Sequence, residues 1–233
     1  MTIEIDVTER PKPKLKPNPL LGVDPEKLAL FKKNFDIEII VINDCSVDQT
    51  LKLLEENKRL YNILLNNSKN SGKGFSVKRG MQEASGEYIF FQDADLEYDV
   101  NDITKFINLI IKFKPDMIIG SRFNYSEYTR SHNFFNKIGN MVITNLFNIL
   151  YNTTFTDIYC CYLCFKKNLF NIKDLKTNGW EQHAEILAKI TKTGSKFYEV
   201  PVNYDGRTMD EGKKIRFYHI FKVISTIIKE RIF

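Results

Sequence analysis

Short apolar runs alternate with amphipathic segments through the first half of the chain. Runs with strand character and segments with helical periodicity follow one another as residues 37–42, 46–60, 61–66, 73–84, 87–92, 100–114 and 116–121. Apolar strands that alternate with helices of this length are typical of a mostly parallel sheet covered by helices on both faces. The pattern therefore predicts an α/β fold.

The start of the chain has a different pattern. Prolines interleaved with lysines in residues 11–19 exclude a helix or a central strand there, so residues 1–21 are predicted to be an extended arm. Residues 2–7 alternate and are compatible with an edge strand, but their acids argue against a central strand. A helix is predicted over residues 23–35, with Asp24 as its N-cap.

The second half of the chain has longer apolar segments. The pattern predicts a helix at 133–152, a strand at 157–165, a helix at 180–194 and a strand at 196–204. Residues 211–233 are predicted to form a basic amphipathic helix. The chain is thus divided into the arm, one α/β domain over residues 22–210, and the C-terminal helix.

Positive charge is concentrated at the end of the chain. The 233 residues carry a formal net charge of +5, and residues 213–233 contain six Lys or Arg against one acid, Glu230. A local basic patch favours a surface or phosphate-bearing partner over nucleic acid, although a solvated helix face has the same pattern. No apolar run reaches the length of a membrane span. No secretory signal is apparent, which predicts a cytoplasmic protein with at most peripheral contact to the cytoplasmic face of a membrane.

Three of the four cysteines fall within residues 160–164. Cys161 and Cys164 have C-x-x-C spacing, but no second pair of Cys or His residues lies nearby to complete a zinc site. We therefore predict that the cysteines pack as small apolar side chains. The three histidines show no metal-ligand spacing and are given no function.

Carboxylates follow two of the predicted strands. Asp44 comes after residues 37–42, and Asp93, Asp95 and Glu97 come at the end of residues 87–92. Ligands of open α/β sheets bind beyond the carboxyl ends of the strands, and unpaired carboxylates this close together would repel each other. We therefore expect a shared cation, either a basic side chain or a metal ion. Carboxylates suit Mg²⁺ or Mn²⁺, which typically bridge the protein to substrate phosphates.

A glycine-rich turn lies between the two acidic sites. Gly72 and Gly74 flank Lys73 at the start of a predicted helix, where free N–H groups and the helix dipole favour an anion. The turn lacks the spacing of a nucleotide-triphosphatase loop. Arg122 follows the strand at 116–121 and is expected at the same edge of the sheet.

Together these motifs have the order of a known family. They are DIEIIVINDCSVDQT, NSGKGFSVKRGMQEASGEYIFFQDADLEY, IIGSRF, TFTDIYCCYLCFKK, GWEQHAEIL and EVPVNYDGRTMDEGKKI. This order resembles family 2 glycosyltransferases of the GT-A fold, a Rossmann-like α/β fold. Within the family it most resembles the dolichyl- or polyprenyl-phosphate sugar synthases. The resemblance covers residues 36–220.

The resemblance implies a set of donor-binding residues. Asp44 and Lys73 would contact the nucleotide base, and Asp93 would lie at the ribose or the metal. Arg207 and Lys213 would clamp phosphate oxygens. The basic residues among these could also be plain surface charges.

The resemblance also implies metal-binding and catalytic residues. Asp95 would bind Mg²⁺ or Mn²⁺, and Glu97 stands where relatives often have a metal-contacting Gln. Arg122 would face the acceptor or the diphosphate. Asp157 and Glu185 match acidic positions near the reacting sugar, although helix caps or ion pairs would also explain these two acids.

Two departures from the family pattern affect these predictions. Relatives begin with a hydrophobic strand that forms part of the base pocket, and residues 1–22 do not match it. This mismatch predicts an incomplete base pocket. Relatives also usually have a glycine near the position of Cys160.

The implied activity is inverting transfer of a hexose from a UDP- or GDP-hexose to a polyprenyl phosphate. A lipid phosphate is mostly ionised at neutral pH and needs little general base. The apolar helix at 133–152 and the basic C-terminal helix could both lie in a membrane interface or pack as core. One alternative is a transferase for a glycan or other hydroxyl acceptor in surface polysaccharide synthesis, with Asp157 or Glu185 as its base. Another is a non-catalytic nucleotide-sugar-binding relative, suggested by the missing first strand.

Overall fold

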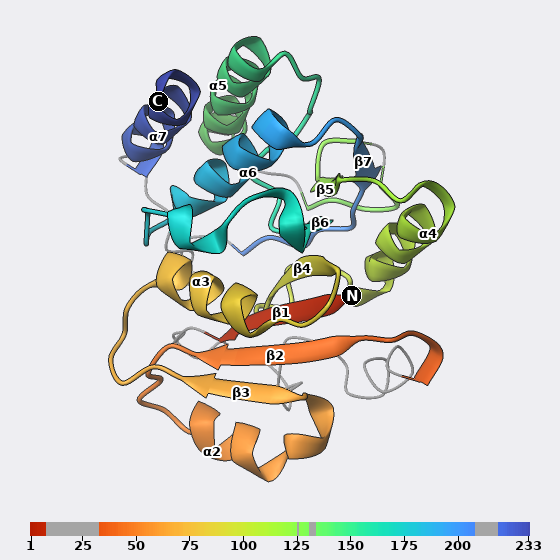
Figure 1. The fold of residues 1–233 in the computed structure, drawn as a ribbon, viewed down its shortest axis with the longest axis vertical. Helices are drawn as coiled ribbons and strands as arrows, with labels where there is room; N and C mark the ends of the chain where they lie inside the picture. Colours follow the sequence, from red (N-terminus) through yellow and green to blue (C-terminus); the bar gives the residue numbers. More distant parts are fainter. Residues whose placement is uncertain (8–32, 125, 131–133, 208–218) are drawn as a thin grey trace.

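A seven-stranded sheet forms the centre of the computed structural model, and helices pack against it (Figure 1). The structure describes residues 1–7, 33–124, 126–130, 134–207 and 219–233. The strand order is β3-β2-β1-β4-β6-β5-β7, and only β6 runs antiparallel to its neighbours. The strands are β1 (Thr2–Val7), β2 (Glu38–Asn43), β3 (Ile63–Asn66), β4 (Tyr88–Asp93), β5 (Met117–Ser121), β6 (Leu163–Lys166) and β7 (Phe197–Pro201). The predicted α/β fold with a mostly parallel sheet is confirmed.

The helices in the described part of the chain lie where the periodicity placed them. They are α2 (Thr50–Glu56), α3 (Lys73–Glu83), α4 (Ile103–Phe113), α5 (Phe134–Tyr151), α6 (Gln182–Thr193) and α7 (His219–Ile232). Short 3-10 turns at Lys58–Leu60 and Val100–Asp102 complete the segments predicted as helices at 46–60 and 100–114. The helix predicted over residues 23–35 lies mostly outside the described residues. The division into arm, domain and C-terminal helix stays a prediction.

Residues 2–7 form a central strand, which contradicts two expectations. β1 pairs in parallel with β2 on one side and β4 on the other, so that Thr2 lies opposite both Glu38 and Ile89. The prediction of an extended arm is therefore wrong for these residues, and so is the conclusion that the first strand is missing. Main-chain hydrogen bonds to both neighbours fix the place of a strand in a sheet, and composition is only a weak guide to it. Residues 8–21 of the predicted arm lie outside the described residues.

The first residue of β1 is tied to the starts of both neighbouring strands. Thr2 is fully buried. Its Oγ1 donates to Glu38 Oε2 (2.9 Å) and accepts from the main-chain N–H of Gly86 (3.1 Å). A Cβ at residue 86 would lie 2.6 Å from that Oγ1, so only glycine fits at this contact. β1 is thus an integral part of the sheet.

The segment predicted as a strand over residues 157–165 is a strand only at its end. β6 begins only at Leu163. Before it, Arg122 binds Asp157, and the chain turns after Asp157, with the N–H of Cys160 donating to the carbonyl of Asp157 (3.4 Å). All four cysteines are free. Cys160 and Cys164 are buried, and burial raises the pKa of both thiols. These two therefore pack as neutral apolar side chains, as predicted.

Helices α5, α6 and α7 contact one another and form a layer beside the half of the sheet that contains β5, β6 and β7 (Figure 1). Phe147 of α5 and Ile227 of α7 are fully buried in this layer. The outward sides of α5 and α7 instead expose large apolar residues, which are Phe134, Phe135, Ile138, Met141, Val142, Ile149, Phe221, Ile228 and Ile232. None of the described helices has the length and apolar character needed to cross a membrane.

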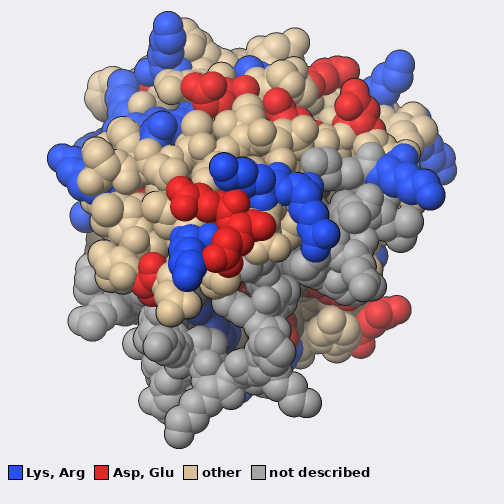
Figure 2. All heavy atoms as spheres, turned by 90° about the horizontal axis from the view of Figure 1, so that it is seen from below, with Lys and Arg blue, Asp and Glu red and all other residues tan. Residues whose placement is uncertain are grey.

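The face that includes α2 has a mixed charge. Figure 2 shows acidic and basic side chains next to one another on the described part of this face. On α2, Lys52 and Glu56 form an exposed pair 3.9 Å apart. A basic patch for nucleic acid is therefore not a feature of this described surface.

Candidate active site

Polar side chains meet at the carboxyl edge of the sheet. β2 leads into Asp44, β4 ends at Asp93, and β5 leads into Arg122. Because β1, β2, β4 and β5 share one direction, these residues lie at the same edge. This is the edge at which open α/β sheets bind their ligands.

The two acidic sites do not share a cation. β1 lies between β2 and β4, and adjacent strands are spaced about 4.8 Å apart, so the ends of β2 and β4 lie about 10 Å apart. Asp44 accepts hydrogen bonds from Asn67 and from the turn before α3, whereas Asp95 binds Arg207, so the two carboxylates bind different groups. The expectation of a single cation between both groups is therefore wrong, because each carboxylate has partners of its own.

Asp44 fixes the glycine-rich turn before α3. Its carboxylate is fully buried and accepts hydrogen bonds from Asn67 Nδ2 (2.7 Å) and from the main-chain N–H groups of Ser71 and Gly72 (both 2.8 Å). The N–H of Gly74 donates to the carbonyl of Asn178 (3.0 Å). The N–H groups predicted to bind an anion are thus largely bonded within the protein. The role of Asp44 at a nucleotide base stays a prediction.

Lys73 and Asp93 form an ion pair. Lys73 is the first residue of α3, and its Nζ lies 2.6 Å and 2.8 Å from the two carboxylate oxygens of Asp93. The same Nζ lies 3.8 Å from Cys161 Sγ and 5.7 Å from the centre of the Trp180 ring. The glycine after Lys73 is required, because a Cβ at residue 74 would lie 2.5 Å from the main chain of Asn178.

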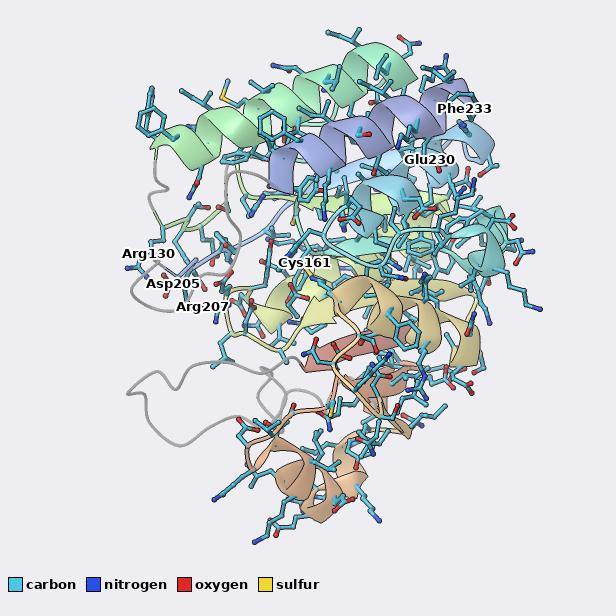
Figure 3. All side chains as sticks on the ribbon, turned by 90° about the vertical axis from the view of Figure 1, so that its left-hand side faces the viewer. Arg130, Cys161, Asp205, Arg207, Glu230 and Phe233 are labelled. Carbon is cyan, nitrogen blue, oxygen red and sulfur yellow. The ribbon has the colours of Figure 1, made fainter. Side chains whose placement is uncertain are left out.

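Asp95 and Glu97 converge on Arg207. Arg207 Nε donates to Glu97 Oε1 (2.6 Å), and its NH2 nitrogen donates to Asp95 Oδ2 (3.1 Å). The hydroxyl of Tyr204 donates to Glu97 Oε2 (2.8 Å). Figure 3 shows Arg207 and Asp205 on the segment that follows β7, and Asp205 pairs with Arg130, which follows β5. The charge of this acidic turn is therefore compensated by a guanidinium group that comes from the other half of the chain.

Left-handed main-chain conformations shape both acidic turns. Cys45, which follows Asp44, has φ of 58°, and Leu96, between Asp95 and Glu97, has φ of 61°. Side chains other than glycine and asparagine adopt this conformation rarely and at some energetic cost, and such residues concentrate at functional sites. The turn at Leu96 is part of the reason that the carboxylates on both sides of it bind the same arginine.

The acidic turn after β4 has the chemistry of a divalent metal site. Asp95 and Glu97 already bind one cationic group together, and their oxygens are the hard ligands that Mg²⁺ and Mn²⁺ prefer. Among the described residues, no three His, Cys, Asp or Glu side chains are arranged to hold a metal ion. Two carboxylates with water and substrate oxygens are a common Mg²⁺ environment. In this structure Arg207 binds the carboxylate oxygens that a metal ion would use.

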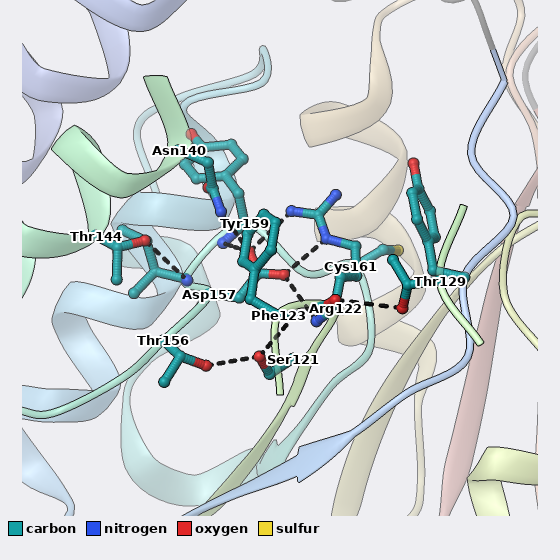
Figure 4. Close-up of polar contacts among 12 residues, drawn as sticks. Ser121, Arg122, Phe123, Thr129, Asn140, Thr144, Thr156, Asp157, Tyr159 and Cys161 are labelled. Carbon is teal, nitrogen blue, oxygen red and sulfur yellow. Dashed lines mark hydrogen bonds and ion pairs between the residues drawn. The ribbon is translucent and has the colours of Figure 1, made fainter. Parts of the chain in front are cut away.

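Arg122 and Asp157 form a second ion pair, which is buried (Figure 4). Arg122 donates to Asp157 through its main-chain N–H (3.1 Å), Nε (2.7 Å) and NH2 nitrogen (2.8 Å), and Asn140 Nδ2 also donates to this carboxylate (2.9 Å). Burial alone would raise the pKa of Asp157, but the charge and hydrogen bonds of Arg122 outweigh it and lower the pKa below its usual value. Asp157 is therefore an ionised partner of Arg122 in this arrangement.

A polar stripe on α5 supports the loop that carries Asp157. Asn140 binds Asp157, Thr144 Oγ1 accepts from the N–H of Ile158 (3.4 Å), and Asn148 binds both the N–H (3.0 Å) and the carbonyl (2.7 Å) of Phe155. Residues four apart on a helix lie on one face. This stripe was not among the predicted functional residues, although three polar residues at a spacing of four in an apolar helix are a visible signal in the sequence.

Glu185 binds the loop that precedes α6. It is fully buried on α6 and accepts from the main-chain N–H groups of Lys176 (2.7 Å) and Thr177 (2.9 Å) and from Thr177 Oγ1 (2.5 Å). These contacts hold the loop that precedes α6. Lys213 lies outside the described residues. The catalytic and binding roles of all these residues stay predictions.

Comparison with known proteins identifies relatives of the chain. The model of glycosyl transferase family 2 matches residues 27–171. A dolichol-phosphate mannosyltransferase of Pyrococcus furiosus is 28% identical over 207 residues, which are 82% of this chain and 56% of that protein. A dolichyl-phosphate beta-glucosyltransferase of Trichomonas vaginalis is 27% identical over 209 residues, 86% of this chain and 63% of that protein. The chain spans 40% to 63% of the length of the curated relatives compared.

Solved structures share the fold. Glucosyl-3-phosphoglycerate synthase from Mycobacterium tuberculosis, in complex with Mn²⁺, UDP and phosphoglyceric acid, aligns over 99% of this chain and 78% of its own, with a TM-score of 0.67 and 11% identity. TarS of S. aureus, in complex with UDP-GlcNAc, aligns over 97% of this chain and 66% of its own, with a TM-score of 0.55 and 14% identity. At these identities the likeness shows a common GT-A fold.

Proposed function

The chain belongs to glycosyl transferase family 2, as its motifs predicted, and on this premise we propose that it transfers a hexose from a nucleotide sugar to a polyprenyl phosphate with inversion. The donor would be a UDP- or GDP-hexose, and Mg²⁺ or Mn²⁺ would be required. The observation that carries the proposal is the convergence of Asp95 and Glu97 on one cation at the ligand-binding edge of the sheet.

The basic residues of the site support the donor assignment. Asp95 and Glu97 would hold the metal ion, which when bound neutralises charge on the departing nucleoside diphosphate. Arg207, now paired with Asp95 and Glu97, would then contact phosphate oxygens, for which its charge is suited, and Lys73 would contact the nucleotide base. One of the compared structures contains UDP with Mn²⁺ and the other contains UDP-GlcNAc, which agrees with this assignment for proteins of the same fold.

The acceptor assignment follows from the state of the remaining acids. Asp157 is bound by Arg122 and Asn140, and Glu185 is bound by the loop at Lys176 and Thr177. A hydroxyl acceptor needs a general base, and either acid would have to give up these contacts to serve as one. A phosphate acceptor, with a second pKa of about 6, is mostly ionised at neutral pH and needs none. The relatives with dolichol-phosphate activities in their names agree with this choice.

The non-catalytic alternative has lost the observation that suggested it. It was based on a missing first strand, and β1 occupies that position in the sheet. The hydroxyl-acceptor alternative remains, and the test below separates it from the proposed activity.

The apolar outward side of α5 and α7 would bring the protein to its lipid acceptor. Phe134 and Phe135 of α5 are 69% and 76% exposed, and Phe221 and Ile232 of α7 are 64% and 67% exposed. The two helices lie side by side (Figures 1 and 3). Exposed basic residues accompany them, at positions Lys137, Lys222, Lys229 and Arg231. Apolar residues with flanking lysines are typical of helices that lie in the interface of an anionic membrane.

Co-sedimentation with lipid vesicles tests the membrane contact. We expect binding to vesicles that contain anionic lipid, weakened by added salt, and little binding to neutral vesicles. A variant with Phe134→Ser and Phe135→Ser should bind less. A control variant with Asn168→Ser, on the opposite end of the sheet, should bind like the wild type. Equal recovery in the supernatant with and without anionic vesicles would contradict the assignment.

A screen of nucleotide sugars with Mn²⁺ tests the activity. We expect transfer to polyprenyl phosphate, and loss of transfer in Asp95→Ala, while the variant Asp174→Ala, which removes an exposed carboxylate outside the site, retains it. Transfer to an oligosaccharide and not to the lipid phosphate would favour the hydroxyl-acceptor alternative. Undiminished metal-dependent turnover in Asp95→Ala would refute the assigned site.

A further inference from the structure

Hydrogen bonds join the first turn of α6 and the loop before it to the first turn of α3. Gln182 Nε2 donates to the carbonyl of Gly74 (2.5 Å), and the N–H of Gly74 donates to the carbonyl of Asn178 (3.0 Å). Lys73 precedes this contact, and His183 follows it. His183, to which the sequence analysis gave no function, is therefore brought to the same part of the molecule as the Lys73–Asp93 pair.

His183 also lies near the Arg122–Asp157 pair. Its ring centre is 5.6 Å from that of Tyr159, whose main-chain N–H donates to Asp157 (3.3 Å). The charges of Lys73, Asp93, Asp157 and Arg122 all act on the imidazole. These contacts bring the side chain near both the Lys73–Asp93 pair and the Arg122–Asp157 pair.

The imidazole carries an unsatisfied polar atom. His183 Nε2 is buried, and nothing in the described part of the chain forms a hydrogen bond with it. A buried polar group without a partner destabilises the fold, so such groups are rare unless a ligand supplies the partner. Burial, with the nearby charge of Lys73, lowers the pKa of His183 to about 4. The ring is therefore neutral near pH 7 and can either donate or accept through Nε2.

We propose that His183 Nε2 hydrogen-bonds a hydroxyl group of the sugar carried by the nucleotide donor. A phosphate would favour the nearby cations Lys73 and Arg122 over a neutral ring. A metal ion is not favoured either, since within the described residues His183 belongs to no group of three potential metal ligands. A hydroxyl both donates and accepts, and so matches a neutral imidazole in either tautomer. This inference rests on the proposed function, because it needs a nucleotide-sugar donor.

Titration calorimetry with Mn²⁺ present tests the contact on wild type, His183→Phe and His183→Gln. The probes are UDP, UDP-glucose, GDP and GDP-mannose. One hydrogen bond between uncharged groups predicts that His183→Phe loses about two- to tenfold in affinity for the nucleotide sugar and none for the nucleotide alone. His183→Gln, which can still form a hydrogen bond, should recover most of the loss.

The melting temperature separates this ligand contact from a purely structural role of His183, because loss of a structural contact would lower it. Removal of an unpaired buried polar atom predicts that His183→Phe melts at the same temperature as the wild type or higher. Equal losses for nucleotide and nucleotide sugar, no loss for either, or a lower melting temperature would overturn the inference. If the wild type binds none of the four probes, the proposed function fails, and the inference fails with it whatever the variants do.

Discussion

Replacement of Asp157 by Asn tests whether this acid is the fixed partner of Arg122. Asp157 is fully buried, and the side chain of Arg122 is 13% exposed. The carboxylate accepts three hydrogen bonds from Arg122, one from Asn140 and one from the N–H of Tyr159. The substitution removes the negative charge and leaves the guanidinium buried without an ionised partner.

The magnitude follows from the burial of the pair. Breaking a buried ion pair by removing one charge costs about 3–5 kcal/mol, which is a large share of a typical stability of about 5–15 kcal/mol. With a urea dependence of about 2 kcal/mol per molar, the midpoint of unfolding should fall by roughly 2 M.

Urea unfolding followed by circular dichroism measures this loss. The control is Glu56→Gln, which removes the exposed pair of Lys52 and Glu56 and should cost less than about 0.5 kcal/mol. A double variant with Arg122→Gln and Asp157→Asn contains no unpaired charge, so we expect it to be more stable than Asp157→Asn alone.

Wild-type stability of Asp157→Asn would contradict this prediction. An Asp157→Asn protein that unfolds at the wild-type urea concentration but has lost transfer to a hydroxyl acceptor would identify Asp157 as a free general base. The argument from the buried ion pair, and with it the choice of a phosphate acceptor, would then be refuted.

Three further predictions concern other parts of the site and fold. Arg207→Ala should bind Mn²⁺ more tightly in the absence of nucleotide, because the guanidinium no longer competes for Asp95 and Glu97. An unchanged affinity in a Mn²⁺ titration would show that Arg207 and Mn²⁺ do not compete for these carboxylates. Deletion of residues 1–7 should abolish cooperative unfolding, because β1 lies between β2 and β4, whereas a protein that unfolds like the wild type would behave as if these residues were a dispensable arm. Burial lowers the pKa of His183 to about 4 in the folded state, from its usual value of about 6.5. The unfolded state therefore binds more protons between these pH values, and the free energy of unfolding should fall as the pH drops from about 6.5 to about 4. His183→Phe should show a weaker decrease in this range, and a pH profile identical to that of the wild type would contradict the assignment.

Local patterns predicted the elements that depend on local chemistry. The apolar strands and the amphipathic helices of the described region are present, and the acids after β2 and β4 lie at the edge where a parallel sheet places them. β1 was mistaken because its position depends on main-chain pairing with strands more than 30 residues away, which side-chain composition does not report.

The partners of the charged residues could not be predicted from local patterns. Arg207 binds Glu97 across 110 positions in the sequence, so no spacing rule connects them. The expectation of a cation at the acidic turn was correct in kind, since a basic side chain was one of the two stated options. His183 gave no signal because a single histidine at the start of a helix is unremarkable until its surroundings are known. Asn140, in contrast, could have been found from the spacing of polar residues on α5.

The two sides of helix α5 contact different surroundings. One side of the helix supports the loop of Asp157 through Asn140 and Thr144, and the other exposes Phe134 and Phe135. If binding to lipid shifts α5, the shift also changes the geometry of the Arg122–Asp157 pair, which Asn140 contacts. Coupling between two sites is reciprocal, so a donor that favours one geometry of this pair must also change the affinity of the protein for lipid. Donor affinity measured on and off vesicles would report the size of this mutual dependence.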